Sequence, residues 1–152
     1  MKDRKTALRR TGRDLTVIGW METIDLPDLE LAGLKAKIDT GARTSALHAT
    51  DIRTFTRNGA SWVSFMADSG HGLCDVPIEA AVRDQRAIKN TSGVPEDRFI
   101  IRTRLRLGGS LWTIELSLSD RSNMTFPMII GRAALKNQAI AVHTRRAFVV
   151  TD

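Results

Sequence analysis

The stretch Ile38-Asp39-Thr40-Gly41-Ala42-Arg43-Thr44-Ser45 carries the most information about this chain. The apolar residues before it predict a short strand that ends at Asp39. Gly41 permits backbone angles and a close approach that a side chain would block. Asp39 supplies an acid or base, and the hydroxyl of Thr40 can lock the turn. Such a turn suits two carboxylates that share one proton, because like charges so close together cannot both ionise.

The three residues Asp39-Thr40-Gly41 also fit an ordinary junction between a strand and a turn, since Asp and Gly are common turn residues. A second segment favours the first interpretation. It is Met128-Ile129-Ile130-Gly131-Arg132-Ala133-Ala134-Leu135. This pattern predicts a short buried strand, a glycine break and the start of a helix with Leu135 facing inward.

Together the two segments resemble the retropepsins, the single-lobe aspartic peptidases that include the retroviral proteases. The retropepsin pattern is Asp-Thr/Ser-Gly-Ala, followed late in the domain by two apolar residues and Gly-Arg-x-x-Leu. The longer stretches 36–49 and 120–132 are similar to a bacterial retropepsin-like family. Its members are often labelled ATP-dependent zinc proteases and occur alongside ATP-grasp ligases that add glutamates to proteins. The resemblance runs from about Ile18 to Val150, and it implies that the late strand packs beside the catalytic turn, buttressed by the helix.

The hydrophobic pattern and the frequent turn signals predict a mainly β fold. With the resemblance, we expect a retropepsin-like closed β-barrel with one short C-terminal helix after Gly131. Residues 15–152 form the expected peptidase domain. The expected strands are 15–20, 23–31 with a bend at Pro27-Asp28, 34–38, 61–67, 76–82, 98–107, 111–118, 140–143 and 147–150. Among them, 61–67 should pair with 76–82, 98–107 with 111–118, and 140–143 with 147–150.

The net charge of +6 in 152 residues is unevenly distributed. Residues 1–14 hold six basic and two acidic side chains, so this segment is expected to be a flexible basic tail. It is either a solvated tail or a contact for an acidic or nucleic-acid partner such as ribosomal RNA. No apolar run approaches the roughly 20 residues that span a bilayer, and the N-terminus lacks a secretory signal. With Cys74 as the single cysteine, we expect a cytoplasmic protein with no membrane partner.

The resemblance implies that Asp39, Thr40 and Gly41 are catalytic. A two-lobed enzyme would carry two such turns, and this chain has one convincing turn. The second aspartate is therefore expected from Asp39 of a second copy in a two-fold homodimer. Asp68-Ser69-Gly70 has a similar form but lies too close along the chain for a second lobe. We interpret it as a glycine-flanked loop and a candidate part of a flap over the substrate.

Substrate-binding residues are expected around the two segments: Ala42, Arg43, Thr44, Arg121 and Arg132. Retroviral enzymes carry acidic residues where Arg43 and Thr44 stand here, so the cleft should be more positive. Arginines suit carboxylates, and Lys89 or Arg98 could assist. The expected substrate is therefore an acidic peptide, such as an oligoglutamate tail on a ribosomal protein. Alternatively, Arg121 and Arg132 are structural and bond backbone carbonyls or Asp120.

No cofactor and no metal are expected. His48, His71 and His143 stand singly, without the spacing of a zinc site, and no phosphate-binding loop is present. Cys74 is interpreted as a small buried apolar residue. Two other functions stay open. One is a non-catalytic retropepsin-like module that binds acidic peptides. The other is a barrel associated with the ribosome or with nucleic acid, although no stacked aromatic platform is evident.

Overall fold

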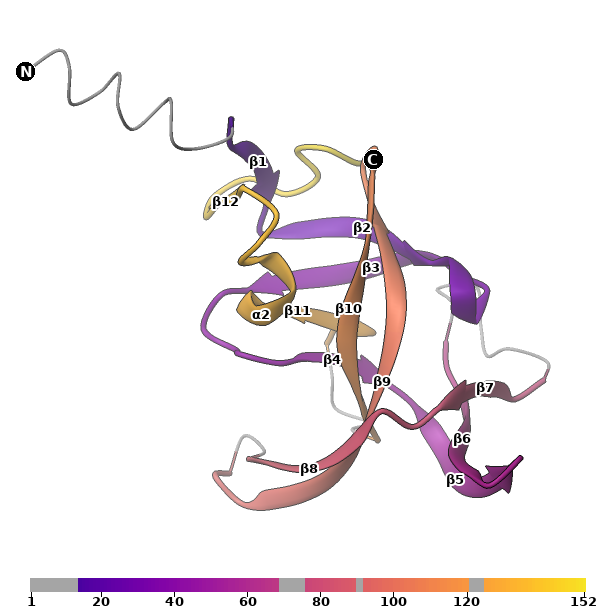
Figure 1. Ribbon diagram of the computed structural model, residues 1–152. Helices are drawn as coiled ribbons and strands as arrows, with labels where there is room; N and C mark the ends of the chain where they lie inside the picture. Colours follow the sequence, from indigo (N-terminus) through magenta and orange to yellow (C-terminus); the bar gives the residue numbers. More distant parts are fainter. Residues whose placement is uncertain (1–13, 69–75, 90–91, 121–124) are drawn as a thin grey trace, which may run out of the picture.

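The computed structural model describes residues 14–68, 76–89, 92–120 and 125–152 (Figure 1). All of the expected basic tail 1–14 except Asp14 lies outside them, as do Ser69 to Asp75 and Arg121 to Met124. The strands are β1 (Thr16–Gly19), β2 (Met21–Leu26), β3 (Leu31–Asp39), β4 (Ser45–His48), β5 (Thr50–Arg57), β6 (Ala60–Met66), β7 (Ile78–Ala81), β8 (Asp84–Lys89), β9 (Pro95–Leu107), β10 (Ser110–Ser119), β11 (Met128–Gly131) and β12 (Ile140–His143). The helical elements are a 3-10 turn, η1 (Pro27–Leu29), and α2 (Arg132–Leu135).

Six of the described strands close into a barrel. In order they are β10, β4, β11, β3, β2 and β9, and β9 pairs back to β10. The strand β8 extends this sheet beyond β9, and in Figure 1 the β8–β9 hairpin reaches away from the barrel as an arm. Two smaller sheets flank it, β5-β6-β7 and the parallel pair β1-β12. The predicted closed β-barrel with a short helix is therefore confirmed.

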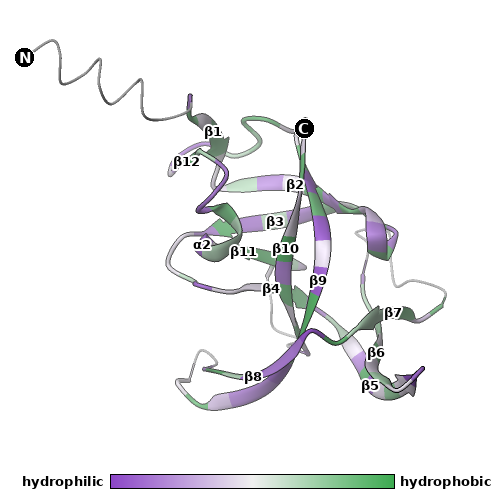
Figure 2. Ribbon diagram, viewed as in Figure 1, coloured by the Kyte–Doolittle hydropathy of each residue, from purple (hydrophilic) through white to green (hydrophobic). Residues whose placement is uncertain are grey.

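The strands β2, β3 and β9 bury every second side chain over much of their length, which is the pattern of strands with one face on a core. In β2, Glu22, Ile24 and Leu26 point inward, and in β9 the buried Ile101, Thr103, Leu105 and Leu107 alternate with exposed arginines. Figure 2 shows this as alternating hydrophilic and hydrophobic bands along β2, β3 and β9. The core continues through β3, β10 and β11, so the strand that leads to Asp39 is anchored by packing.

Several predicted pairings are confirmed. β9 and β10 form an antiparallel hairpin across Gly108-Gly109 with Leu107 opposite Ser110. β6 and β7 pair around the Asp68 loop, with Phe65 opposite Ile78. The bend at Pro27-Asp28 is the turn η1, which ends at Glu30 with a left-handed φ of 57°.

The predicted pairing of 140–143 with 147–150 is wrong. β12 pairs in parallel with β1, and residues 147–150 form no strand. Phe148 adopts a φ of 53°, which breaks an extended run. The segment is held instead by the buried carboxylate of Glu22, which accepts hydrogen bonds from the backbone N–H groups of Val149, Val150 and Thr151.

Candidate active site

Asp39 is the last residue of β3, and its carboxylate lies half-buried at the turn that follows. The Asp39 Oδ1 accepts a hydrogen bond from the Gly41 backbone N–H at 3.1 Å, and the Asp39 carbonyl accepts one from Ala42 at 3.1 Å. These bonds close a tight turn and orient the carboxylate. Within the part of the chain that the structure describes, Asp39 forms no ion pair, so its carboxylate remains available to a further group.

The strand β11 lies against the Asp39 turn. It runs parallel to β3 with Ile130 opposite Ile38 and Gly131 opposite Asp39. A Cβ on Gly131 would lie 2.7 Å from the Thr44 carbonyl carbon and 2.8 Å from that of Arg43. The two chain segments thus approach so closely that only glycine fits at position 131.

Ser45 links the turn to two barrel strands. Its hydroxyl accepts a hydrogen bond from the buried Gly131 N–H at 3.0 Å, and its carbonyl accepts one from the Ser117 hydroxyl at 2.9 Å. A buried polar group without a partner is costly, so these two contacts hold the turn in one position.

The start of α2 binds the same turn. The N–H of Arg132 donates to the Ala42 carbonyl at 2.8 Å, and that of Ala133 to the Arg43 carbonyl at 3.1 Å. The Arg132 Nη1 donates to the carbonyls of Thr40 at 3.2 Å and Gly41 at 3.3 Å. Arg132 therefore binds backbone carbonyls, as expected if its role is structural, and it forms no ion pair with any described acidic residue.

Thr40 is exposed, and its hydroxyl makes no hydrogen bond within the described residues. Beside it lies a groove of about 570 Å³ with a mostly apolar lining, which includes Ile38 of β3, Leu135 of α2 and Ile140 of β12. Leu15, at its edge, is 64% exposed. This side of the Asp39 turn thus presents a hydroxyl without a partner among the described residues, next to an apolar surface.

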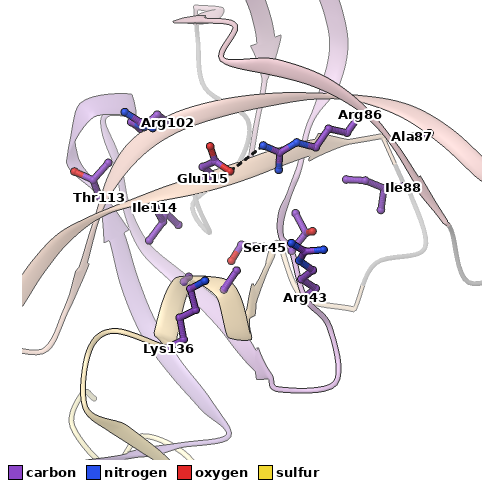
Figure 3. Close-up of a pocket in the computed structure, with 13 residues that line it drawn as sticks. Arg43, Ser45, Arg86, Ala87, Ile88, Arg102, Thr113, Ile114, Glu115 and Lys136 are labelled. Carbon is purple, nitrogen blue, oxygen red and sulfur yellow. Dashed lines mark hydrogen bonds and ion pairs between the residues drawn. The ribbon is translucent and has the colours of Figure 1, made fainter.

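A cleft of about 910 Å³ opens on the other side of the turn (Figure 3). Arg43, Thr44 and Ser45 line it from the turn, and Arg86, Ala87 and Ile88 from the β8–β9 arm. Its remaining walls are Arg102 of β9, Thr113, Ile114 and Glu115 of β10, Ala133 and Ala134 of α2, and Lys136. Figure 3 shows Arg43 below Ile88, with Lys136 at the end of α2. The arm that overhangs this cleft was not predicted, because β8 is largely exposed and polar.

Four cations and one carboxylate line the cleft. Arg86 donates to Asp84 at 2.7 Å and to Glu115 at 3.1 Å, and both contacts raise its pKa. The hydrogen bond from Arg86, with one from the Gln85 backbone, lowers the pKa of Asp84. Arg43, Arg102 and Lys136 form no ion pair with any residue that the structure describes. The cleft therefore has an excess of positive charge.

The remaining predicted residues are placed as follows. Ala42 lies half-buried in the turn. Arg98 is buried with its Nη2 on Glu96 at 3.1 Å, and neither it nor Lys89 lines the cleft. Arg121 and the Ser69-Gly70 part of the Asp68 loop lie outside the described residues. Arg86, Arg102, Glu115 and Lys136 were missed, since a single charged residue on a strand or at a helix end looks like an ordinary solvated residue.

Among residues 14–68, 76–89, 92–120 and 125–152, no three His, Cys, Asp or Glu side chains come together to hold a metal ion. His71 and Cys74 lie outside these ranges. In the same ranges, no helix combines the length and apolar character needed to cross a membrane.

Residues 17–152 match the family described as the retropepsin-like aspartic endopeptidase RimB, named RimB-like. The chain belongs to the RimB-like family. The match covers the barrel, the Asp39 turn and the Gly131 strand, so the resemblance to a bacterial retropepsin-like family is confirmed. It also places the Asp39 turn within a family that is described as an endopeptidase.

Curated relatives carry a different name. A probable alpha-L-glutamate ligase of Desulfotalea psychrophila is 43% identical over 129 residues, and one of Parasynechococcus marenigrum is 40% identical over 126. Each match covers 82% of this chain but only 27% of the relative. The chain thus spans about a quarter of the length of these relatives.

A solved structure has the same fold. It is that of Lpg0085 from Legionella pneumophila, described as a protein with unknown function (DUF785). The TM-score is 0.76 at 26% identity, over 90% of this chain and 98% of the other. The similarity therefore extends over nearly the whole described barrel.

Proposed function

We propose that two copies of this chain form an aspartic endopeptidase in which each contributes Asp39 to one catalytic pair. The observation that carries the proposal is the Asp39 turn: a half-buried carboxylate, oriented by Gly41 N–H, on a turn fixed by Gly131 and Arg132. Membership of a family described as retropepsin-like aspartic endopeptidases supports it. A carboxylate that is held rigidly and left without an ionic partner suits acid and base chemistry.

The proposed reaction is hydrolysis by an activated water. The ionised Asp39 takes a proton from water as the water oxygen bonds to the scissile carbonyl carbon. The protonated Asp39 of the second copy gives its proton to the carbonyl oxygen. When the resulting tetrahedral diol collapses, the Asp39 that took the proton from water gives it to the amine nitrogen as the C–N bond breaks. The other Asp39 takes a proton from a diol hydroxyl, so a carboxylic acid and an amine leave and the pair returns to its starting state. Gly41 allows the two turns to approach, and Ala42 packs under the substrate backbone.

The second copy is proposed to cover the apolar groove beside Thr40. This groove contains exposed apolar surface, and burial of such surface is the main driving force for association. The free Thr40 hydroxyl would then find a hydrogen-bond partner in the other subunit. A two-fold interface uses the same patch on both copies, which brings the two Asp39 turns together on the axis.

The proposed substrate is an acidic peptide, such as an oligoglutamate tail on a ribosomal protein, with Arg43 and Thr44 among the residues that bind it. Two observations support this: the excess of positive charge in the cleft, and the glutamate-ligase names of relatives that share this region. An enzyme that removes glutamates and a ligase that adds them would act on the same protein tails. An association with an ATP-grasp ligase is therefore part of the proposal.

The direct test incubates the protein with short peptides, including oligoglutamate, and follows the products by mass spectrometry. We expect fragments that together carry one added water, formed equally well with EDTA present. Asp39→Asn should abolish the products while peptide binding persists. If the protein were only a binding module, it would release no fragments and Asp39→Asn would change nothing. Cleavage that survives Asp39→Asn, or that EDTA stops, would contradict the aspartic mechanism.

A further inference from the structure

The cleft between the catalytic turn and the β8–β9 arm holds more positive charge than its own acidic residues neutralise. Glu115 is the only carboxylate among the described lining residues, and Arg86 already bonds to it at 3.1 Å. Arg83 approaches the other Glu115 oxygen at 4.0 Å. Glu115 therefore has two guanidinium partners before any other cation of the cleft is considered.

Three further cations remain available. Arg102 stands directly opposite Glu115 in the β9–β10 register yet forms no ion pair with it. Arg43 and Lys136 approach from the turn and from the end of α2. Opposite charges across strands attract, so the missing bond leaves Arg102 free to bind an added anion. Arg86 differs from these three because Asp84 and Glu115 fix it in place.

The walls between these charges are apolar or small. Ile88 from the arm, the buried Ile114 and the alanines of α2 lie between the cationic groups. A glutamate side chain has this same arrangement, with methylene groups that pack on apolar surface and a carboxylate at the end. No aromatic side chain lines the described cleft, so stacking of nucleic-acid bases has no platform there.

We propose that this cleft is a subsite for acidic side chains of the substrate, in which Arg43, Arg102 and Lys136 bind carboxylates while Arg86, held by Glu115 and Asp84, shapes the wall. The inference rests on the proposed peptidase function, since it assigns one part of the substrate to a place beside Asp39. An extended peptide rises by about 3.3 Å per residue and alternates its side chains, so every second glutamate would face the same wall. The volume of about 910 Å³ is large for a single side chain.

The test measures binding separately from cleavage. In full-length Asp39→Asn protein, titration calorimetry gives the Kd of a hexaglutamate peptide and of a matched hexaglutamine peptide. We expect the Kd of the glutamate peptide to be about tenfold lower or more, which corresponds to one or more charge-assisted hydrogen bonds. Added salt should reduce the difference between the two Kd values. Adding Arg43→Gln, Arg102→Gln and Lys136→Gln together should remove most of the preference.

Matched variants keep the test specific. Arg106→Gln removes an exposed arginine that lies on β9 with Arg102 but does not line the cleft. This variant should leave the preference for hexaglutamate over hexaglutamine unchanged. A double charge reversal, Arg102→Glu with Lys136→Glu, should turn the preference toward a lysine peptide. Equal binding of the two peptides, or a preference that survives the triple substitution, would overturn the subsite. An oligonucleotide of equal charge that binds more tightly than hexaglutamate would overturn it as well.

Cleavage by the unsubstituted protein then separates the two proposals. If it cuts glutamate and glutamine peptides equally, the peptidase function stands and the acidic subsite is wrong. If it cuts neither peptide but the charge-dependent binding persists, the subsite stands and the peptidase function is wrong.

Discussion

At the scale of single residues, Gly131 and Glu22 show how much one position can control. Gly131 lies where the Asp39 turn and β11 meet, and the backbone atoms of Arg43 and Thr44 occupy the space that a Cβ would need. Glu22 is a fully buried carboxylate that ties the C-terminal residues to β2. The importance of Gly131 was evident from the sequence because the Gly-Arg pattern is specific. The burial of Glu22 was not evident, because charged residues are almost always exposed and a single glutamate in a sequence gives no sign of burial.

Gly131→Ala should destabilise the fold and the Asp39 turn. The new methyl group would meet backbone carbons of Thr44 and Arg43, which cannot rotate away. We expect a loss of roughly 1–3 kcal/mol in the free energy of unfolding, as for other overpacked sites, measured by urea titration. The control is Gly109→Ala, because a Cβ on Gly109 meets nothing within 4 Å. Equal stability of the two variants would contradict the close approach.

The buried Glu22 should make the free energy of unfolding depend on pH. Burial raises its pKa, but hydrogen bonds from the Thr151 hydroxyl and from the backbone of Gly19, Val150 and Val149 outweigh this, so its pKa lies below the ordinary 4.5. The folded state therefore binds the proton less tightly than the unfolded state. The stabilisation is complete above pH 4.5 and is lost as pH falls through the folded pKa.

Glu22→Gln should remove this stabilisation at neutral pH, a loss of roughly 1.5–3 kcal/mol for hydrogen bonds to a charged group. The variant should also show a weaker decline in stability below pH 4.5 than the parent protein. Urea unfolding across this pH range measures both effects, with exposed Glu30→Gln as the control. Identical pH profiles for Glu22→Gln and the parent protein would refute the role of the carboxylate.

At the scale of elements, α2 holds the Asp39 turn in place. Two backbone N–H groups at its start and the Arg132 side chain bind four carbonyls between Thr40 and Arg43. Its end is tied to β10 by the Trp112 Nε1, which donates to the Ala134 carbonyl at 2.8 Å. The helix thereby connects the turn to the barrel wall.

Arg132→Gln should loosen the turn without unfolding the barrel. Because the lost bonds position Asp39 rather than bind substrate, we expect kcat to fall about tenfold or more with a small change in KM. Amide hydrogen exchange at Gly41 and Ala42 should speed up. Arg106→Gln, which alters an exposed arginine of β9 that lines neither the groove nor the cleft, is the matched control. A rise in KM with unchanged kcat would instead assign Arg132 to substrate binding.

The predicted elements differ from the observed ones for identifiable reasons. β9, β10 and β11 were recognised because their apolar residues recur with the period of a strand or form a short buried run. β5 and β8 were missed because their side chains are largely exposed, so polarity hid the strands. The segment 147–150 was wrongly predicted as a strand because it is rich in apolar residues. Its backbone N–H groups at Val149 and Val150 donate to the Glu22 carboxylate of β2 instead of to a neighbouring strand.

At the scale of the whole molecule, the barrel brings distant segments together. β3 and β11 are far apart in sequence yet lie in register, and β8 and α2 face each other across the cleft. The sequence could predict the Asp39 turn and its neighbour Gly131, because each has a distinctive local pattern. The cationic cleft depends on side chains from four separate segments, and no local pattern marks such a convergence.

Subunit mixing tests whether Asp39 acts in pairs across two subunits. Parent protein and Asp39→Asn are combined in varying ratios at constant total concentration, allowed to exchange by unfolding and refolding together, and assayed on a peptide that the parent cleaves. If catalysis needs Asp39 from both copies, activity should fall as the square of the parent fraction, because mixed dimers are inactive. A linear fall would show that each chain cleaves with its own Asp39 and would contradict the account.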